Sequence, residues 1–283
     1  MPTVELSSVA VDYRDTGGDG PVLVLLHGLL MDGSLWDDVV ALLAADHRCV
    51  VPTLPLGAHR RPSHPGADRS LRGLAALVGE FLGALDLTDV VLVGNDTGGA
   101  LAQLVLTGHR TRVGAAVLVA CDTDGNLPPG ISGKSLTLLG RLPPALFGAF
   151  LGQLRVKPLR RSPLAFGWLT RHGDAATRRW LEPLWTRREI RTDTVALLRA
   201  IYADRTVLAG ADLTAVGVPV LVVWAAGDRI MPTEGGRRLA AAFPRGRFVE
   251  VPGTRTLIPL DQPSELAGLL RRFVQHPPGA ART

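Results

Sequence analysis

Short apolar runs that alternate with stretches of helical spacing constrain the fold of this 283-residue chain more than any other feature. The runs are apolar throughout rather than at every second residue, which indicates strands that are buried on both faces. Because helices separate these strands, the order predicts a mostly parallel central sheet covered by helices on both faces, with a strand pair at residues 4–17 in front of it. We expect further strands at 21–28, 47–55, 90–93, 113–120, 218–228 and 247–253, and helices at 35–43, 71–85, 98–109, 234–242 and 264–274.

The stretch from about residue 124 to 210 interrupts this order. It carries no strong strand signal, and prolines punctuate it. We interpret residues 124–210 as a helical cap inserted after the sixth strand, so that residues 1–123 and 211–283 form one core domain. The cap holds more bulky apolar side chains than an isolated helical insertion can bury, and some of them should face the core across a cleft.

Composition narrows the class of protein. A hydrophobic content of 46% and a charged content of 20% are typical of globular proteins. The net charge of +5 comes almost wholly from arginines that are not gathered in one stripe, so we expect no nucleic-acid partner. Cys49 and Cys121 lie in or at the end of apolar runs, which favours buried, reduced thiols.

Location and cofactors are predicted by what the sequence lacks. No apolar run reaches the roughly 18 residues that a membrane span needs, and residues 1–17 do not resemble a signal peptide. We therefore expect a cytoplasmic protein with no membrane partner, and a homodimer is left open. Histidines and carboxylates do not fall at metal-ligand spacing, and no phosphate-binding glycine loop precedes a helix apart from residues 94–98, so we expect no metal and no cofactor.

One short motif carries chemistry. "VVLVGNDTGGALAQLVL" is a strand, then Gly94-x-Asp96-x-Gly98, then a helix. Glycines on either side allow the sharp turn that lifts a central side chain above the sheet, which is the arrangement of a nucleophile elbow. An acid occupies the position where many enzymes of this kind keep a serine.

With this motif the chain resembles the α/β-hydrolase superfamily, particularly its aspartate-nucleophile branches, the haloalkane dehalogenases and epoxide hydrolases. "LLHGLL", the elbow, the cap, "AAGDRIMP" and "PLDQP" carry the resemblance over nearly the whole chain. It implies an α/β-hydrolase fold. It also implies an oxyanion hole formed by the backbone N–H groups of Leu29 and Thr97.

The same resemblance implies a catalytic acid after one of two strands. Asp228 stands at the usual position, and Asp122 stands where some aspartate-nucleophile relatives keep theirs. We favour Asp228 and keep Asp122 as a pocket acid; either could instead cap a turn. His27 precedes an oxyanion-hole residue, and we interpret it as a structural turn histidine rather than a catalytic one.

The catalytic histidine of the family is missing from its expected place. In the family it stands three residues before a proline, and counting back from Pro259 that position holds Thr256. An aspartate nucleophile forms an ester with the substrate, and a base must then activate water to cleave it. A threonine hydroxyl has no basic form near neutral pH, so Thr256 cannot be that base.

Other residues bear on how the site works. His59 follows a strand and should lie at the carboxyl-end face of the sheet, which makes it the best substitute base. Thr97 replaces the tryptophan that helps dehalogenases hold a halide, so a halide site is doubtful. Epoxide hydrolases usually place two cap tyrosines to protonate the epoxide oxygen, whereas this chain has Tyr13 in an early strand and Tyr202 late in the cap, so at most one fits that role. Leu30 and Leu257 are further candidates for the pocket wall.

Three functions remain open from the sequence. In the first, Asp96 is a general acid/base, assisted by Asp228 or Asp122, in a non-hydrolytic reaction such as an elimination, an isomerisation or a ring-forming addition. In the second, Asp96 is the nucleophile of an epoxide hydrolase-like or other hydrolase, with a substitute base such as His59. In the third, the protein binds a ligand without chemistry. The apolar cap favours a bulky apolar small molecule as the substrate, in the manner of a specialised metabolite.

Overall fold

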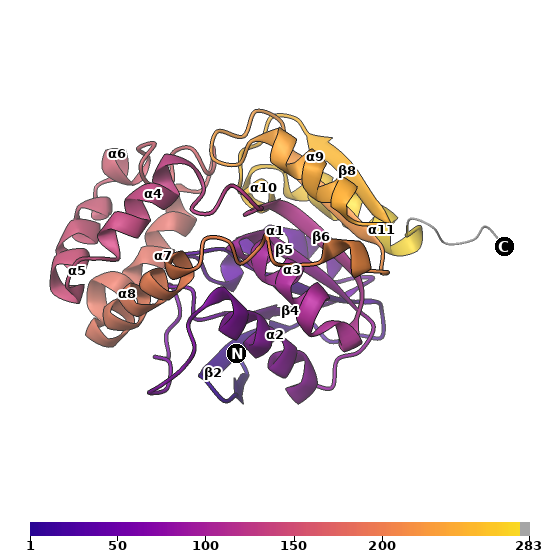
Figure 1. Cartoon of the computed structure of the whole chain (residues 1–283), viewed down its shortest axis with the longest axis horizontal. Helices are drawn as coiled ribbons and strands as arrows, with labels where there is room; N and C mark the ends of the chain where they lie inside the picture. Colours follow the sequence, from indigo (N-terminus) through magenta and orange to yellow (C-terminus); the bar gives the residue numbers. More distant parts are fainter. Residues whose placement is uncertain (278–283) are drawn as a thin grey trace.

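An eight-stranded sheet runs through the centre of the computed structural model, which describes residues 1–277 (Figure 1). The strand order is β1-β2-β4-β3-β5-β6-β7-β8. Pairing is antiparallel between β1 and β2 and between β2 and β4, and parallel across the rest of the sheet. The strands are β1 (Thr3–Glu5), β2 (Ala10–Asp15), β3 (Val22–Leu26), β4 (Arg48–Pro52), β5 (Val90–Asp96), β6 (Val113–Cys121), β7 (Val220–Ala225) and β8 (Gly246–Val251).

The direction of each crossover decides which face a helix covers. Parallel strands are joined by right-handed crossovers. The connection from β3 to β4 leads toward the β1 edge of the sheet, whereas the later connections lead toward the β8 edge. The helix after β3 therefore lies on one face, where it packs against the last helix, and the helices after β4, β5 and β7 lie on the other face. These helices are α1 (Asp37–Leu43) with α11 (Pro263–Gln275), and α2 (Leu71–Ala84) with α3 (Thr97–Gly108) and α9 (Thr233–Ala242).

Helices fill the chain between β6 and β7 and form a separate group beside the sheet (Figure 1). They lie within the predicted cap, residues 124–210. The mostly parallel sheet, the helices on both faces and the inserted cap confirm the predicted fold class. The cap helices are α4 (Gly130–Leu139), α5 (Pro144–Gly152), α6 (Lys157–Arg160), α7 (Asp174–Thr186) and α8 (Arg188–Ala203); α10 (Ile258–Asp261) is a single turn before α11.

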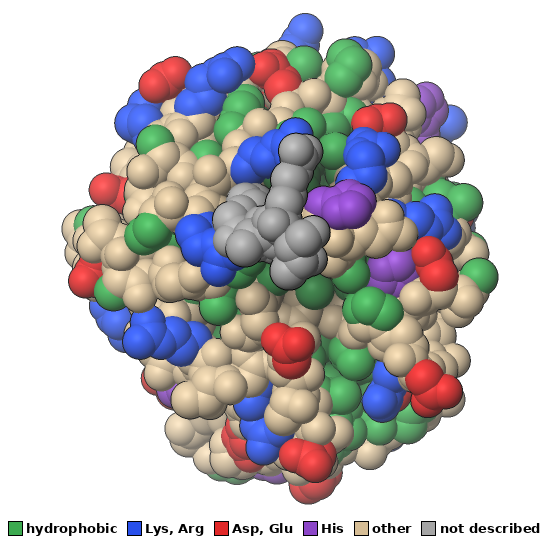
Figure 2. Space-filling model, turned by 90° about the vertical axis from the view of Figure 1, so that its right-hand side faces the viewer, with side chains coloured by type: hydrophobic (Ala, Val, Ile, Leu, Met, Phe, Trp, Pro, Cys, Tyr) green, Lys and Arg blue, Asp and Glu red, His purple; other side chains and the backbone are tan. Residues whose placement is uncertain are grey.

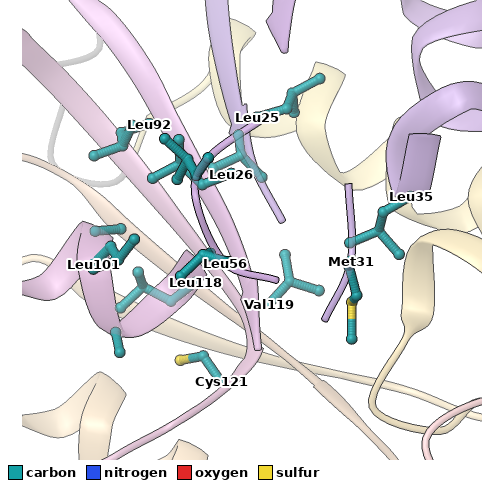
Figure 3. Close-up of a cluster of buried hydrophobic side chains, with 14 of the residues drawn as sticks. Leu25, Leu26, Met31, Leu35, Leu56, Leu92, Leu101, Leu118, Val119 and Cys121 are labelled. Atoms are coloured by element: carbon teal, nitrogen blue, oxygen red, sulfur yellow. The ribbon is translucent and has the colours of Figure 1, made fainter. Parts of the chain in front are cut away.

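The core lies under the carboxyl ends of the central strands. Figure 3 shows a cluster of buried side chains that includes Leu25 and Leu26 of β3, Leu92 of β5, Leu118 of β6 and Leu101 of α3, and all five are fully buried. Burying each leucine stabilises the fold by about 1.5–3 kcal/mol. The end of β5 is therefore supported by a rigidly packed core. The two cysteines are free and buried, as predicted.

The first helix starts later than the sequence suggested. The sequence predicts a helix from residue 35, but residues Gly33–Trp36 form a 3-10 turn and α1 begins at Asp37. The side chain of Asp32 caps the turn by accepting from the Ser34 N–H at 2.9 Å. An aspartate side chain can accept a hydrogen bond from the N–H two residues later, so Asp32 is the N-cap of the turn that precedes α1.

Candidate active site

Asp96 sits in a strained turn between β5 and α3. Its backbone has φ +57° and ψ −128°, a conformation that non-glycine residues rarely adopt. Such strain costs about 1–3 kcal/mol, and it persists only where the surrounding structure enforces it. Gly98 makes the turn feasible, because a Cβ atom there would lie 2.5 Å from the backbone oxygen of Leu26. The predicted elbow geometry is therefore present in the structure.

Two backbone N–H groups hold one oxygen of the Asp96 carboxylate. Oδ1 accepts from the N–H of Thr97 at 2.8 Å and from the N–H of Leu29 at 3.1 Å. These are the donors that the resemblance assigned to an oxyanion hole, and here they bind the side chain of Asp96. Gly28 leaves room for this contact, because a Cβ atom there would collide with the carboxylate. The site is therefore built to fix a carboxylate in one orientation.

The hydroxyl of Thr97 links Asp96 to a second buried acid. Thr97 Oγ1 lies 3.2 Å from Asp96 Oδ1 and 3.2 Å from Asp122 Oδ2. A hydroxyl has one proton to donate, so it satisfies both contacts only if one of the two carboxyl groups is itself protonated and donates. Asp122 Oδ1 is buried and has no hydrogen-bond partner.

Electrostatics indicate that Asp122 is the protonated partner. Burial raises the pKa of Asp122 well above its usual range, and the nearby charge of Asp96 raises it further. Burial also raises the pKa of Asp96, although the N–H groups of Thr97 and Leu29 oppose this shift. Asp122 can therefore stay neutral and donate to Thr97, which in turn donates to an ionised Asp96.

Asp228 and Thr256 form a separate pair. Thr256 Oγ1 donates to Asp228 Oδ1 at 3.0 Å, and the N–H groups of Ile230 and Met231 donate to the same oxygen at 2.8 and 3.0 Å. Burial raises the pKa of Asp228 to about 6 even though these bonds oppose the shift. The side chain of Asn95 holds the Thr256 carbonyl at 2.9 Å. The acid that the sequence favoured thus contacts a threonine.

His27 and His59 are both occupied elsewhere. His27 Nδ1 donates to the Gly28 carbonyl at 2.9 Å while Nε2 accepts from the Leu54 N–H at 2.9 Å, and complete burial lowers the pKa of this imidazole to about 4. His59 Nδ1 accepts from the Gly57 N–H at 3.1 Å, which leaves Nε2–H to donate to Asp193 at 2.9 Å.

This geometry corrects the prediction that His59 substitutes for the missing base. Neither nitrogen of His59 is free to accept a proton from water, because one accepts a backbone N–H and the other carries a proton bound to Asp193. His27 behaves as the structural turn histidine that the sequence suggested.

A cavity of about 350 Å³ lies between the elbow and the cap. Asp96, Thr97, Leu29 and Leu30 line it from the core, and the cap supplies most of the remaining wall. The wall is mainly apolar, which is typical of small-molecule sites in proteins. Its lining residues from the cap and the β7 side include Ser132, Leu136, Leu138, Leu139, Phe150, Leu151, Gln153, Leu154, Leu159, Ser162, Leu164, Ala165, Phe166, Leu169, Tyr202 and Ile230.

The predicted pocket residues divide into two groups. Leu30 and Tyr202 line the cavity, whereas His27, His59, Thr256 and Leu257 do not. Thr256 and Leu257 are fully buried behind the wall, because the turn after β8 packs inside the core. The sequence analysis missed the polar wall residues, among them Ser132, Gln153 and Ser162, since the cap carries no motif that marks them.

Asp193 on α8 anchors the cap to the core. Its carboxylate accepts from His59, from the backbone and hydroxyl of Ser63 at 3.0 and 2.7 Å, and from Arg69. Burial alone would raise the pKa of Asp193, but the hydrogen bonds from His59 and Ser63 outweigh it and hold the pKa well below its usual range. This cluster fixes the helix that carries Tyr202 over the elbow.

Comparison with known proteins defines the class. The sequence profile of the alpha/beta hydrolase family matches residues 23–269, and the chain therefore belongs to the alpha/beta hydrolase family. It is 27% identical to haloalkane dehalogenase 2 of Mycobacterium tuberculosis, covering 93% of this chain and 91% of that protein. A 2-hydroxy-6-oxononadienedioate/2-hydroxy-6-oxononatrienedioate hydrolase of Cupriavidus pinatubonensis is 27% identical, covering 84% of this chain and 81% of that protein.

Solved structures agree on the fold. A putative ancestral haloalkane dehalogenase superposes with a TM-score of 0.73 at 19% identity, covering 98% of this chain and all (100%) of the other.

Within residues 1–277, no cluster of three or more histidine, cysteine or acidic side chains could hold a metal ion. In the same residues, helices are too short or too polar to cross a membrane.

Proposed function

We propose that this protein is an enzyme that uses Asp96 to transfer a proton on a bulky, mainly apolar small molecule, in a reaction that forms no ester on Asp96. An elimination, an isomerisation or a ring-forming addition meets this description. One observation carries the proposal: none of the histidines in residues 1–277 lines the cavity, and a threonine faces Asp228. Without an imidazole, an ester on Asp96 has no base to direct water at it.

The arrangement of Asp96 suits proton transfer. Oδ1 is held by backbone N–H groups, whereas the described residues provide no hydrogen bond to Oδ2, and Asp96 lines the cavity. Oδ2 can remove a proton from a carbon of the substrate, so that the C–H electron pair moves into the substrate. The same oxygen then returns the proton to another atom or to a leaving group.

Asp122 supports this role by keeping its own proton. Two negative charges on either side of the Thr97 hydroxyl in a buried site would strongly disfavour each other. A neutral Asp122 leaves one charge on the pair. Through Thr97 it also donates toward Asp96, which stabilises the ionised form that acts as the base.

Tyr202 is the titratable side chain that shares the cavity wall with Asp96. Burial raises the pKa of its hydroxyl well above the usual value, and the charge of Asp96 raises it further. Tyr202 therefore keeps its proton and can donate a hydrogen bond to a substrate oxygen. A carbonyl placed there would accept the charge that builds up when Asp96 removes a neighbouring proton.

Hydrolysis through an ester on Asp96 is the second candidate function. Relatives named as a haloalkane dehalogenase and as a hydrolase favour it, and the free Oδ2 could attack a carbon atom as well as remove a proton. This reaction needs a base for the second step, and His59 is bound to Asp193 and Gly57.

Isotope labelling separates the two functions. The enzyme is incubated in ¹⁸O-water with haloalkanes, terminal epoxides, β-hydroxy ketones and polycyclic enones. The masses of the products and of the peptide that contains Asp96 are then measured by mass spectrometry. We expect conversion of a ketone substrate without incorporation of water oxygen and an unlabelled Asp96 peptide. A heavy oxygen in Asp96 after turnover, or a substrate adduct on it, would establish the ester route, because water cleaves an aspartyl ester at the aspartate carbonyl carbon.

A further inference from the structure

The outer surface of the first cap helices is unusually apolar. Seven large hydrophobic side chains are between 45% and 64% exposed within residues 131–164, whereas the rest of residues 1–277 contains two such side chains, Met1 and Leu42. Single exposed leucines are ordinary, but a concentration of them on one segment marks an interaction surface. We call this set the cap collar: Ile131, Leu138, Leu146, Phe150, Val156, Leu159 and Leu164.

The cap collar lies at the opening of the cavity. Leu138, Phe150, Leu159 and Leu164 line the cavity and are also exposed to solvent by 64%, 46%, 45% and 55%. A side chain that does both stands where the cavity meets the outside. Whatever covers the cap collar therefore also covers the entrance for the substrate.

The same segment has charges of only one sign. Between Asp124 and Asp174 the sequence contains no aspartate or glutamate, although the chain has 26 acidic residues. The stretch holds both lysines of the protein and several arginines. The exposed basic side chains are Lys134, Arg141, Arg155, Lys157 and Arg171.

The opposite face of the molecule looks different. Figure 2 views the side away from the cap, and there acidic and basic side chains alternate over the surface. The one-signed charge of the cap segment is therefore a local property, since the whole chain carries a net charge of only +5. Residues 125–173 thus combine exposed apolar side chains with cations and contain no acidic residue, although Asp174, just beyond them, lies 3.8 Å from Lys157. Such a surface complements one that is apolar inside and anionic outside.

We propose that the cap collar docks on a lipid surface with anionic headgroups and that the substrate enters the cavity from that surface. The leucines and Phe150 would insert below the headgroups, while Lys134 and Lys157 would contact lipid phosphates. A lipid surface fits better than an acidic protein, because the apolar side chains project from three separate short helices and the turns beside the last of them, and a fluid surface can accept each of them. The proposal departs from the expectation of no membrane partner, which rested on the lack of a membrane-spanning run and not on the surface of the cap. This docking does not depend on the reaction at Asp96.

Vesicle binding of the full chain tests the docking without any substrate. Vesicles of phosphatidylcholine alone are compared with vesicles of equal parts phosphatidylcholine and phosphatidylglycerol, by flotation on a density gradient. We expect binding to the mixed vesicles that weakens as salt is raised, since salt screens charges near a surface. Binding to neither vesicle type would overturn the proposal.

Matched variants distinguish the cap collar from nonspecific attraction. Lys134→Glu with Lys157→Glu should reduce partitioning to anionic vesicles on the order of tenfold or more. Arg238→Glu with Arg247→Glu makes the same change in net charge away from the cap and should leave binding within about twofold, because a surface charge acts within a Debye length. Equal losses from both pairs would show that only net charge matters and would reject the cap collar.

The apolar part needs its own control. Phe150→Ser with Leu159→Ser should weaken vesicle binding, whereas Leu42→Ser should not. All variants alter exposed side chains, and circular dichroism with thermal melting verifies that they fold. If the serine pair leaves vesicle binding unchanged and instead abolishes self-association in size-exclusion chromatography, the cap collar is a contact between copies of this chain and the proposal fails.

Discussion

Thr256 donates its hydroxyl to Asp228 across 3.0 Å, at the position where the resemblance to aspartate-nucleophile enzymes places a histidine. The acid is in place and oriented by the N–H groups of Ile230 and Met231, but its partner cannot accept a proton from water. The chemistry available to this protein therefore depends on whether Asp96 forms a bond to the substrate or only exchanges a proton with it.

Replacing Thr256 by histidine tests that dependence. In Thr256→His the imidazole can donate to Asp228 and accept from water, so we expect multiple turnovers on haloalkanes or epoxides where the parent enzyme gives one or none. Thr256→Ser keeps the hydroxyl and should behave as the parent does. Sustained hydrolysis of these compounds by the parent protein, equal to that of Thr256→His, would show that the site already has a base.

Asp96→Asn tests the central residue. The amide keeps an oxygen for the N–H groups of Leu29 and Thr97 but cannot take a proton, so activity should fall by roughly 10²–10⁴-fold or more. Ligand binding, measured by calorimetry with the best substrate, should persist. Unchanged turnover would remove Asp96 from the mechanism, and an absence of any turnover in the parent protein with intact binding would favour a protein that only binds its ligand.

The buried Asp228 makes stability depend on pH with a definite sign. Its pKa is about 6 in the folded chain against 3.8 in the unfolded chain, so folding favours the protonated form. The resulting stability is fully present below pH 3.8 and is lost as pH rises to about 6, by about 3 kcal/mol. Asp228→Asn should flatten this part of the urea-unfolding profile. An identical slope in the variant and the parent would contradict the burial argument.

Asp122 should be visible as a neutral acid. Because burial and the charge of Asp96 raise its pKa well above the usual range, infrared spectra at neutral pH should contain the C=O band of a protonated carboxyl group. Asp122→Asn should remove that band. In Asp96→Asn the pKa of Asp122 should fall, since the charge that raises it is gone, and the band should disappear at a lower pH than in the parent. A band that survives Asp122→Asn belongs to another residue.

The hydrogen bonds of Asp193 should stabilise the packing of the cap against the core. Asp193→Ala leaves His59, Ser63 and Arg69 without their shared acceptor, and we expect a loss of about 3–5 kcal/mol in the free energy of unfolding. The hydrogen bonds hold the pKa of Asp193 low, so its contribution is present above the unfolded pKa and declines as pH falls below it. Glu189→Gln on the same helix is exposed and should change little. Equal protease sensitivity of the cap in both variants would argue against an anchor.

Local patterns explain why much of the fold could be predicted. The apolar runs of β3, β5 and β7 predict strands that are buried on both faces, whatever their neighbours in the sheet. The glycines around Asp96 permit a backbone turn that few other residues allow. These signals lie within a few residues of one another. The helical cap was also predictable, because proline-punctuated helical spacing replaced the strand signal.

The contacts that decide the chemistry could not be predicted in the same way. The sequence by itself determined the α/β fold, the elbow and the absence of a histidine at position 256. Only the tertiary structure paired His59 with Asp193, which lies 134 residues away, and joined Asp122 to Asp96 through the hydroxyl of Thr97. Such contacts depend on how distant elements pack, and packing is set by the shapes of many side chains at once rather than by any local period.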